Sequence, residues 1–381
     1  MDLSIPTELI QLQESVRRFV TRELRPLEHD IDQADDIDPD LARELRMRAV
    51  ALGLVGFNIP AGIGGGGVGP LGEVLIGEEV GRTSVPLADA VGRLPQALVF
   101  ASEEQRPWLL APALRGETTV CVALSEPDAG SDLMGIQTQA RPDGDSWKIN
   151  GSKVFISNVD TCDYALVLAV TDPTAPLRSR FTTFVVDRND PGLEITRRFR
   201  KMGWRGYHIS AFSLDTHVAC DRVLGEVGGG FETIMASVNS MRLYIASRCV
   251  GAAKELLRLA VEYTQNRSTF GQRLGDHQAI QFMLADMDVE IEAARLLVLS
   301  TAWKAENKAD DVRIAASRAK LYASEMAGRA ADATVQIFGG AGYMDDYPVE
   351  RLYRDVRAFR IGEGTSEMQR VQIARHLLNG A

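Results

Sequence analysis

Apolar residues change their spacing twice along this chain, and this change restricts the fold more than any other feature. In the first third they recur every three or four residues, the period of an amphipathic helix, over residues 7–28, 39–53, 71–82 and 94–115. From about residue 119 the segments become short and rich in β-branched and aromatic residues, as strands are. After residue 234 long helical patterns return. The order along the chain is therefore helical, β, helical.

Five sequences form the expected strands of the middle part: TTVCVALSE, WKINGSKVFISN, DYALVLAV, RFTTFVVD and ISAFSLD. Turn sequences separate them, such as RPDGD at 141–145 and RNDPG at 188–192. The sequence therefore predicts an α+β protein with a helical unit at 1–118, a β unit at 119–234 and a second helical unit at 235–381. Because no long linker separates these units, we expect them to pack as one body.

Composition and charge restrict the partners. The chain is 45% hydrophobic and 25% charged, as soluble globular proteins are. Its formal net charge of −10 disfavours nucleic acid and anionic membranes, although the local cluster TRRFRK at 196–201 leaves room for phosphates. No apolar run reaches the length that spans a bilayer. We therefore expect neither nucleic acid nor a membrane as partner, whereas small anionic ligands remain open.

Residues that bind metals or form disulfides are scattered along the chain. The four cysteines lie too far apart for a CxxC motif, and no secretory signal precedes them. The histidines form neither HxxxH nor HExxH, and the acidic run DIDQADDIDPD at 30–40 lacks the glycine of an EF-hand loop. We therefore expect no metal, reduced thiols and a cytoplasmic location. The acidic run is interpreted as a polar connection between helices.

One glycine-rich run imitates a dinucleotide fingerprint. In GGGVGPLG, Gly67, Gly69 and Gly72 have the GxGxxG spacing, and a helical pattern follows. However, Pro60 and several glycines occupy the place of the strand that should precede it, and no βαβ pattern surrounds it. We therefore interpret this run as a flexible loop and not as a nicotinamide site.

A carboxylate lies between two glycines in RIGEGTSEMQR, residues 360–370. The missing Cβ atoms of Gly362 and Gly364 would let a planar ligand or thioester lie against the main chain, where Glu363 offers both a base and an N–H donor. The alternative is a helix boundary, at which Gly364 ends one helix, Thr365 caps the next and Glu363 is solvated. The segment by itself favours the boundary.

Two longer sequences are more specific: ALSEPDAGSDLMG at 123–135 and QIFGGAGYMDDYPVERLYRD at 336–355. Together with KVFISN, NRSTFGQ and RIGEGTSE, they resemble the acyl-CoA dehydrogenase family of flavoproteins, over essentially the whole chain. The resemblance implies an N-terminal α-helical domain, a middle β-barrel or β-sandwich domain, a C-terminal four-helix bundle and bound FAD. It also implies that Glu363 is the catalytic base, because the family places one before GT in this motif. At the family's other position for a base, before Arg242, this chain has Met241.

The reaction implied by the resemblance is the α,β-desaturation of an acyl thioester, carried by coenzyme A or a carrier protein. Glu363 would remove the α-proton while a hydride leaves the β-carbon for N5 of the flavin. The main-chain N–H of Glu363 and a ribityl hydroxyl would stabilise charge on the thioester oxygen. An electron-transfer flavoprotein or similar acceptor would take the electrons. Two alternatives remain: a flavin oxidase or monooxygenase of the same fold, and a non-catalytic subunit of a hetero-oligomer.

The same resemblance implies further site residues. On pattern alone, KVFISN is an ordinary half-buried strand and NRSTFGQ a helix terminus. In the family, the second is an arm that reaches the flavin of a neighbouring subunit, which implies a homodimer or homotetramer. The implied flavin contacts are Leu124, Ser125, Phe155, Ser157, Arg267, Phe270, Gln278, Gln336, Gly339, Gly340, Thr365 and Glu367. The implied ligand contacts are Ser131, Arg242 and Gly364.

The chain departs from the family pattern at several positions. Asn239 stands where many members have an aspartate, and YHIS at 207–210 replaces a frequent serine-aspartate-threonine, so the coenzyme A or carrier end is expected to be held differently. Arg82 and Arg93 fall in a region that shapes the acyl pocket in the family. A surface position is expected for each, with binding of a carboxylate or another polar acyl group as the alternative. The acyl chain is not determined by the sequence.

Overall fold

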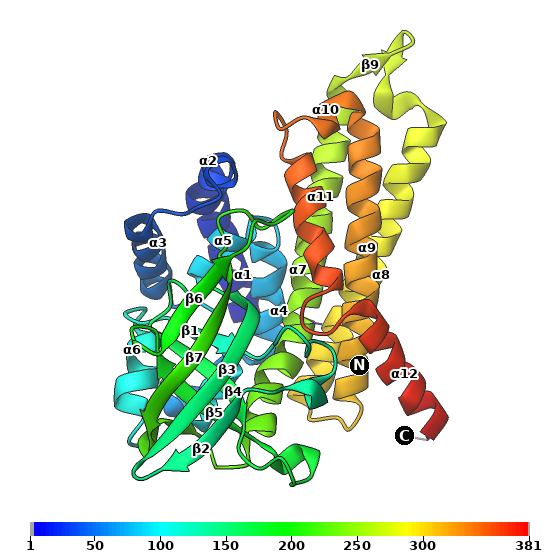
Figure 1. Cartoon of the computed structure of the whole chain (residues 1–381). Coiled ribbons are helices and arrows are strands. Elements are labelled where there is room, and N and C mark those ends of the chain that lie inside the picture. The colour runs from blue at the N-terminus through cyan, green and yellow to red at the C-terminus, as the bar shows by residue number, and fades with distance from the viewer. Residues whose placement is uncertain (1–3, 380–381) are drawn as a thin grey trace.

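Helices from both ends of the chain flank a central sheet in the computed structural model, which describes residues 4–379 (Figure 1). The first helical unit and the sheet lie side by side, and a taller bundle of helices stands next to both. The predicted order of helical, β and helical parts and the α+β class are confirmed.

The first unit contains α1 (Thr7–Phe19), α2 (Glu28–Ala34), α3 (Pro39–Ala51), α4 (Gly69–Val80), α5 (Val85–Ala88) and α6 (Ala111–Leu114). The expectation of a regular helix over 94–115 is wrong. Short 3-10 and π turns at Gln96–Phe100 and Arg106–Leu110 precede the short helix α6. Pro95, Pro107 and Pro112 lack the N–H donors that a continuous helix needs.

The acidic run at 30–40 is only partly a connection. Its first half continues α2, in which Ile31 is buried and Glu28 and Asp32 accept hydrogen bonds from two arginines of the C-terminal unit, Arg351 and Arg354. These ion pairs compensate the buried carboxylates, so the helix extends further than the local sequence indicates. The connection itself is limited to residues 35–38.

The glycine-rich run forms an ordered turn rather than a flexible loop. Main-chain N–H groups of Gly65, Gly66 and Val68 donate to carbonyls of Pro60, Gly56 and Phe57, and α4 begins directly afterwards. Turns and a short 3-10 segment precede the run in place of the strand that a nicotinamide site requires.

The middle unit is one sheet with the strand order β6-β7-β3-β2-β4-β5-β8, and β1 pairs with β4 in parallel. The strands are β1 (Val120–Ala123), β2 (Gln139–Asp143), β3 (Ser146–Ser157), β4 (Tyr164–Val170), β5 (Phe181–Asp187), β6 (Leu193–Arg198), β7 (Ile209–Ala219) and β8 (Val223–Leu224). The five expected strands are present. The sequence missed β2, β6 and β8, because they are polar or very short.

Both faces of β4 are buried. Leu166 and Leu168 pack towards Leu109 and Leu110 of the first unit, whereas Val167 belongs to the core on the other face. The rings of Trp147 on β3 and Phe184 on β5 lie 5.5 Å apart although these strands are not neighbours in the sheet. The sheet therefore curls around its own core.

The C-terminal unit consists of α7 (Gly230–Asn266), α8 (Gln278–Glu306), α9 (Val312–Phe338), α10 (Gly340–Tyr343), α11 (Val349–Arg357) and α12 (Ser366–Asn379), with a hairpin of β9 (Ser268–Thr269) and β10 (Gln272–Arg273). Buried alanines of α7 and α9, such as Ala253 and Ala327, let these helices approach closely. The proposed boundary after residue 234 lies inside α7, so we propose that the third unit begins with this helix.

Candidate active site

Glu363 lies in a tight turn between the 3-10 segment Ala358–Arg360 and α12. Its φ is +55°, in the left-handed region that is uncommon for residues other than glycine, and φ of Gly364 is +88°. A Cβ on Gly364 would lie 2.7 Å from Nε2 of Gln369, whereas one on Gly362 would have only an ordinary contact of 3.7 Å with a carbonyl. Gly364 is therefore required by the turn, and Gly362 is not.

The carboxylate of Glu363 has no hydrogen-bond or ion-pair partner within residues 4–379, although the side chain is partly buried. Burial raises its pKa, against the opposing charges of Arg93, Arg242 and Lys320. Its main-chain N–H also has no acceptor in the part of the chain that the structure describes. The turn therefore presents a base and a free donor next to each other.

The helix-boundary interpretation is correct for one residue of this turn. The hydroxyl of Thr365 accepts a hydrogen bond of 3.2 Å from the N–H of Met368 and so caps α12. Glu363, in contrast, is not simply solvated, because its side chain is partly buried and its pKa is raised.

The carbonyl of Gly364 accepts two side-chain hydrogen bonds. Nε2 of Gln369 on α12 lies at 2.9 Å, and Nζ of Lys320 on α9 lies at 2.7 Å. Sequence reasoning missed both residues. The motif containing Gln369 was in view, but Lys320 stands 44 residues away from Gly364 and only the packing of α9 against the turn brings it there.

The predicted flavin contacts Leu124 and Ser125 directly follow β1, and both are half-buried. Lys153 on β3 donates to the carbonyl of Leu124 and pairs with the carboxylate of Glu126 at 2.8 Å. Glu126 also accepts from the main-chain N–H groups of residues 137 and 138. This buried pair closes the loop that contains Ser131, which is itself exposed.

Phe155 interrupts the regular pairing of β3 with β7. The register shifts between Lys153 and Ile156, and φ of Phe155 is +58°. The bulge turns the ring outwards, where it is 64% exposed and contacts Phe199 at 5.1 Å. Ser157 follows at the end of β3 and is half-buried. An exposed aromatic ring held by a strained bulge is suited to a planar ligand.

The loop at 199–208 connects this sheet surface to the turn of Glu363. Besides the contact between Phe199 and Phe155, Trp204 donates to Oδ1 of Asp355 on α11 at 2.6 Å and packs on Phe359, four residues before Glu363. The same loop therefore contacts two regions of the candidate site. One region is Phe155 with its neighbours, and the other is the segment that leads to the turn of Glu363.

Arg242 on α7 is buried and lies close to this turn. Its Nη1 donates to Gln372 of α12, while Nε is buried without a partner within residues 4–379. Oδ1 of Asn239, one turn earlier on α7, is likewise buried and unpaired in the described chain. Such atoms usually find a partner in water or a ligand, so they mark positions where a bound acyl compound can be recognised.

The arginines of the acyl region are not free surface residues. Arg82 pairs with Glu255 at 3.1 Å and with Glu79 at 3.7 Å. The side chain of Arg93 is 6% exposed and pairs with Glu73 at 3.1 Å, while its Nη1 points to the sulfur of Met241 at 3.2 Å. The expectation of two surface arginines is therefore wrong, because glutamates in the core neutralise both.

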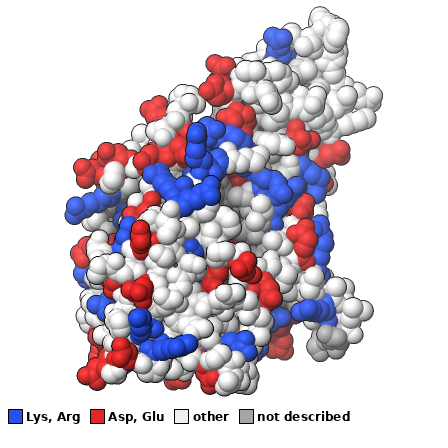
Figure 2. Space-filling model, viewed as in Figure 1, with Lys and Arg blue, Asp and Glu red and all other residues white. Residues whose placement is uncertain are grey.

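Of the other predicted flavin contacts, Thr365 and Glu367 lie at the start of α12, beside Glu363, and the rest belong to the opposite end of the helical bundle, around the β9–β10 hairpin (Figure 1). Phe270 stands at the turn of the β9–β10 hairpin with φ +50° and is 98% exposed, and Arg267 is exposed at the end of α7. Gln278 begins α8 nearby, and Gly339 and Gly340 end α9 at the same place, where the rings of Tyr263 and Phe338 stack at 4.0 Å. Figure 2 shows that acidic and basic groups are mixed over this face and that the projecting tip carries few of them.

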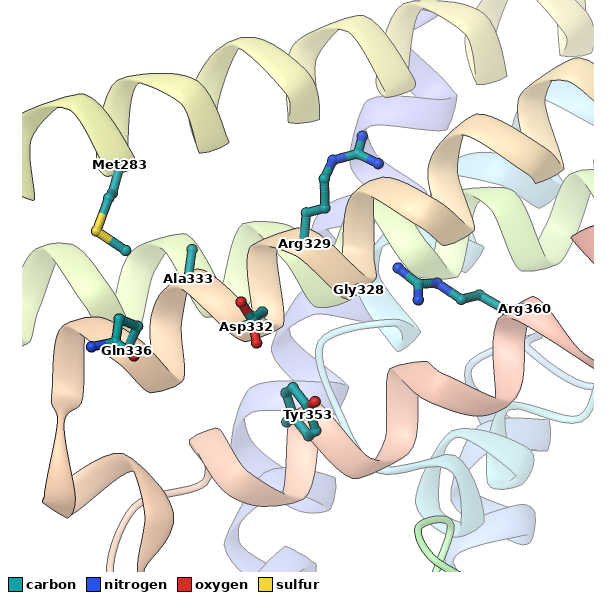
Figure 3. A pocket seen from close by; sticks show the side chains of 8 residues that line it. All are labelled: Met283, Gly328, Arg329, Asp332, Ala333, Gln336, Tyr353 and Arg360. Carbon is teal, nitrogen blue, oxygen red and sulfur yellow. The ribbon is translucent and has the colours of Figure 1, made fainter.

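Gln336 lines a pocket of about 400 Å³ between α8, α9 and α11 (Figure 3). Arg329, Asp332 and Gln336 enter it from α9, and Tyr353 enters from α11. Arg329 and Arg360, which also line it, pair with Glu290 and Glu325. The pocket does not include Glu363, so it is separate from the catalytic turn.

Two kinds of ligand surface therefore fit a flavin. One is the exposed ring of Phe155 beside the half-buried Leu124, Ser125 and Ser157, and the other is the uncovered ring of Phe270 with Arg267. Gly339 and Gly340 have open space where a Cβ would lie, which suits close approach of a dinucleotide to the main chain. Within residues 4–379, no group of three metal-ligating side chains is present, and none of the helices there is both long and apolar enough to cross a membrane.

A partly buried, unpaired carboxylate beside a free N–H donor is suited to removing a proton next to a carbonyl group. Together with the three-part fold, it indicates an acid–base enzyme with an adjoining surface for a planar cofactor.

Comparisons with known proteins specify this class. The N-terminal, middle and C-terminal domain models of acyl-CoA dehydrogenase match residues 6–117, 121–217 and 228–378. The chain is 37% identical to the probable acyl-CoA dehydrogenase YngJ of Bacillus subtilis (strain 168), over 99% of this chain and 100% of the other. It therefore belongs to the acyl-CoA dehydrogenase family, whose members are flavin-dependent oxidoreductases acting on CH–CH groups, and its function is that of an acyl-CoA dehydrogenase.

Solved structures agree over the whole length. The butyryl-CoA dehydrogenase of Megasphaera elsdenii matches with a TM-score of 0.90 and 32% identity, covering 99% of this chain and 100% of the other. A glutaryl-CoA dehydrogenase of Mycobacterium smegmatis in complex with FADH2 matches with a TM-score of 0.90 and 28% identity, covering 99% and 96%. The predicted fold of three acyl-CoA dehydrogenase domains is thus confirmed.

Proposed function

We propose that Glu363 is the catalytic base of an FAD-dependent acyl-CoA dehydrogenase. The observation that carries this proposal is the unpaired carboxylate in a left-handed turn, with a raised pKa and a free main-chain N–H. A carboxylate with a raised pKa holds an abstracted proton better than an ordinary surface glutamate does.

The chain's own groups divide the reaction between them. The carboxylate of Glu363 takes the α-proton, and its N–H donates to the thioester oxygen, where negative charge develops. The positive charges of Arg93, Arg242 and Lys320 limit the rise of the pKa of Glu363 and so favour the ionised base. A bound flavin supplies the acceptor for the hydride from the β-carbon.

FAD is proposed to lie between two copies of the chain. Phe155, Ser157, Leu124 and Ser125 would hold the ring system near Glu363, with Thr365 and Glu367 beside it. The second group, Arg267, Phe270, Gln278, Gln336, Gly339 and Gly340, belongs to the ends of α7, α8 and α9 around the β9–β10 hairpin, which Figure 1 shows at the far end of the bundle. One chain does not bring the two groups to one ligand, which supports a homodimer or homotetramer.

The acyl group is proposed to be uncharged. Arg82 and Arg93 already have glutamate partners in Glu255 and Glu73. A carboxylate on the acyl chain would therefore have to displace a glutamate to pair with either arginine. Ser131, Arg242 and Gly364 are proposed to contact the thioester part of the ligand. We propose coenzyme A as the carrier of this thioester.

Electron-transfer flavoprotein or a similar protein is the proposed acceptor, and the cytoplasm is the proposed location.

Glu363→Gln tests the role of the base. We expect the variant to keep its flavin and to lose nearly all anaerobic bleaching of the flavin band by acyl-CoA, because an amide does not accept the proton. Glu103→Gln is the control, because it changes an exposed carboxylate of the first unit outside the proposed site; it should be reduced close to the parent rate. Reduction of Glu363→Gln at the parent rate would remove the proposed base.

The acyl group is tested with two thioesters. Butyryl-CoA should bleach the flavin of the parent protein, and glutaryl-CoA should do so at least about tenfold more slowly, because it adds a buried charge without a partner. Faster reduction by glutaryl-CoA would show that Arg93 exchanges Glu73 for the substrate.

A further inference from the structure

Two lysines of this chain are fully buried, and they differ in how their charge is compensated. Lys153 is paired with Glu126 at 2.8 Å. Lys320 is 0% exposed, and within residues 4–379 its only hydrogen bond is the one to the carbonyl of Gly364. A buried ammonium group without a carboxylate contact is costly to maintain, so its position calls for a reason beyond packing.

The charges around Lys320 point towards the catalytic turn. Burial lowers its pKa to about 8, and Cys249, Glu363 and Glu325 oppose this while Arg242 adds to it. Glu325 already has partners in Arg360 at 3.3 Å and Ser366 at 2.7 Å. Glu363, in contrast, has no hydrogen-bond or ion-pair partner among residues 4–379, and the positive charges that act on it are those of Arg93, Arg242 and Lys320. Lys320, Arg242 and Glu363 are therefore charged groups of this region without an ion-pair partner in the described chain.

The hydrogen bond of Lys320 acts on the residue next to Glu363. Both Glu363 and Gly364 have positive φ, a conformation that persists only when its surroundings impose it. The Gly364 carbonyl is fixed from two sides, by Lys320 on α9 and by Gln369 on α12. Because α9 belongs to the packed bundle, Lys320 anchors the turn to the rigid part of the molecule.

We propose that Lys320 is a positioning residue for the desaturation: its ammonium group holds the carbonyl of Gly364, fixes the turn that carries Glu363 and favours the ionised form of the Glu363 carboxylate. This inference rests on the proposed role of Glu363. It assigns Lys320 two separable contributions, a hydrogen bond that orients the base and a positive charge that favours its deprotonated form.

Three substitutions separate these contributions. Lys320→Met removes donor and charge, Lys320→Gln removes the charge and keeps a donor on a shorter side chain, and Lys320→Arg keeps the charge. Lys304→Met is the matched control, because Lys304 pairs with Asp311 at the turn between α8 and α9. Each protein is purified with FAD, its flavin content and melting temperature are measured, and its anaerobic reduction by butyryl-CoA is followed by stopped flow over pH.

We expect Lys320→Met to retain flavin, to lower the limiting rate of reduction at least about tenfold and to leave the apparent affinity for the thioester nearly unchanged. The acid limb of its pH profile should move up by about one unit, because a neighbouring positive charge is lost. The acid limb of Lys320→Gln should move by the same amount. This variant therefore replaces Lys320→Met in the test if the methionine variant does not fold. Lys320→Arg should restore the acid limb of the parent, and Lys304→Met should match the parent throughout.

A second measurement is independent of turnover. In protein labelled with ¹³C-glutamate, the carboxyl signal that disappears in Glu363→Gln reports the pKa of Glu363, and this pKa should be higher in Lys320→Gln than in the parent. An unchanged pKa and acid limb in Lys320→Gln would overturn the inference, as would a shift of equal size in Lys320→Arg. If Glu363→Gln is reduced at the parent rate while the pKa of Glu363 still responds to Lys320, the proposed base fails and the electrostatic coupling stands.

Discussion

Residues with positive φ coincide with the proposed site. Seven residues other than glycine have this conformation among residues 4–379: Asp35, Phe155, Asn158, Trp204, Phe270, Lys308 and Glu363. Phe155, Phe270 and Glu363 were predicted as flavin contacts or as the base, and Trp204 fastens the loop between sheet and bundle. Backbone strain of this kind is maintained only where the surrounding structure compensates it. At these positions the conformation presents an exposed ring or an unpaired carboxylate.

Gly364→Ala tests the requirement of the turn. The substitution places a Cβ at φ +88° and within 2.7 Å of Gln369 Nε2, so we expect a loss of about 1 kcal/mol or more in unfolding free energy and slower flavin reduction. Gly362→Ala is the matched control, because its Cβ meets only an ordinary contact of 3.7 Å. Melting temperatures and reduction rates of both variants check this. Equal effects at the two glycines would contradict it.

At the scale of elements, the loop at 199–208 holds three parts of the chain together. His208 binds Asp160 after β3 through Nδ1 and Asp36 after α2 through Nε2, each at 2.8 Å. Arg198 lies 3.5 Å from Asp36. Burial would lower the pKa of His208, and Arg198 acts in the same direction, but the two carboxylates outweigh both and raise it. The charged imidazole therefore stabilises the joint between the first unit and the sheet.

The pH dependence of stability follows from this raised pKa. Histidine has a pKa of about 6.5 in the unfolded chain, so the stabilising effect is complete below that pH and disappears as the pH rises through the higher folded pKa. We expect His208→Gln to lower the melting temperature more at a pH of about 5.5 than at about 8.5. His217→Gln is the control, since His217 and Asp143 are both exposed and solvent screens their pair. The same pH dependence in both variants would exclude His208 as the cause.

At the scale of the whole molecule, the hairpin of β9 and β10 projects from the end of the helical bundle (Figure 1). Its tip residue Phe270 is 98% exposed, and its neighbours at the end of α9 are exposed glycines. A large uncovered apolar ring of this kind is typical of an interaction site. Assembly with a second copy would complete the proposed flavin site.

Arg267→Ala should therefore copurify with less FAD and bind added FAD more weakly than the parent, because a phosphate contact is lost. Arg273→Ala is the matched control on the same hairpin, where Arg273 pairs with Asp276 at 3.1 Å. Light scattering coupled to gel filtration should show at least a dimer for the FAD-loaded parent. A monomer with full FAD content, or equal FAD loss in both arginine variants, would contradict the contact across subunits.

The sequence by itself determined the order of the three units, the strands with alternating β-branched residues and the carboxylate between two glycines, because these depend on local periodicity and on motifs of contiguous residues. It missed β2 and β6, whose polar residues form strands only beside β3 and β7. It also assigned helix to 94–115, where prolines interrupt the hydrogen bonds.

Only the tertiary structure decided how Glu363 is held. Lys320, Gln369 and Arg93 approach Glu363 or its turn from different elements, and nothing in their local sequence marks them. The neutralisation of Arg82 and Arg93 by glutamates was likewise invisible, because each partner lies on another turn or helix. Burial and unpaired charge depend on which elements pack together, and contacts between residues far apart in the chain have no local pattern in the sequence.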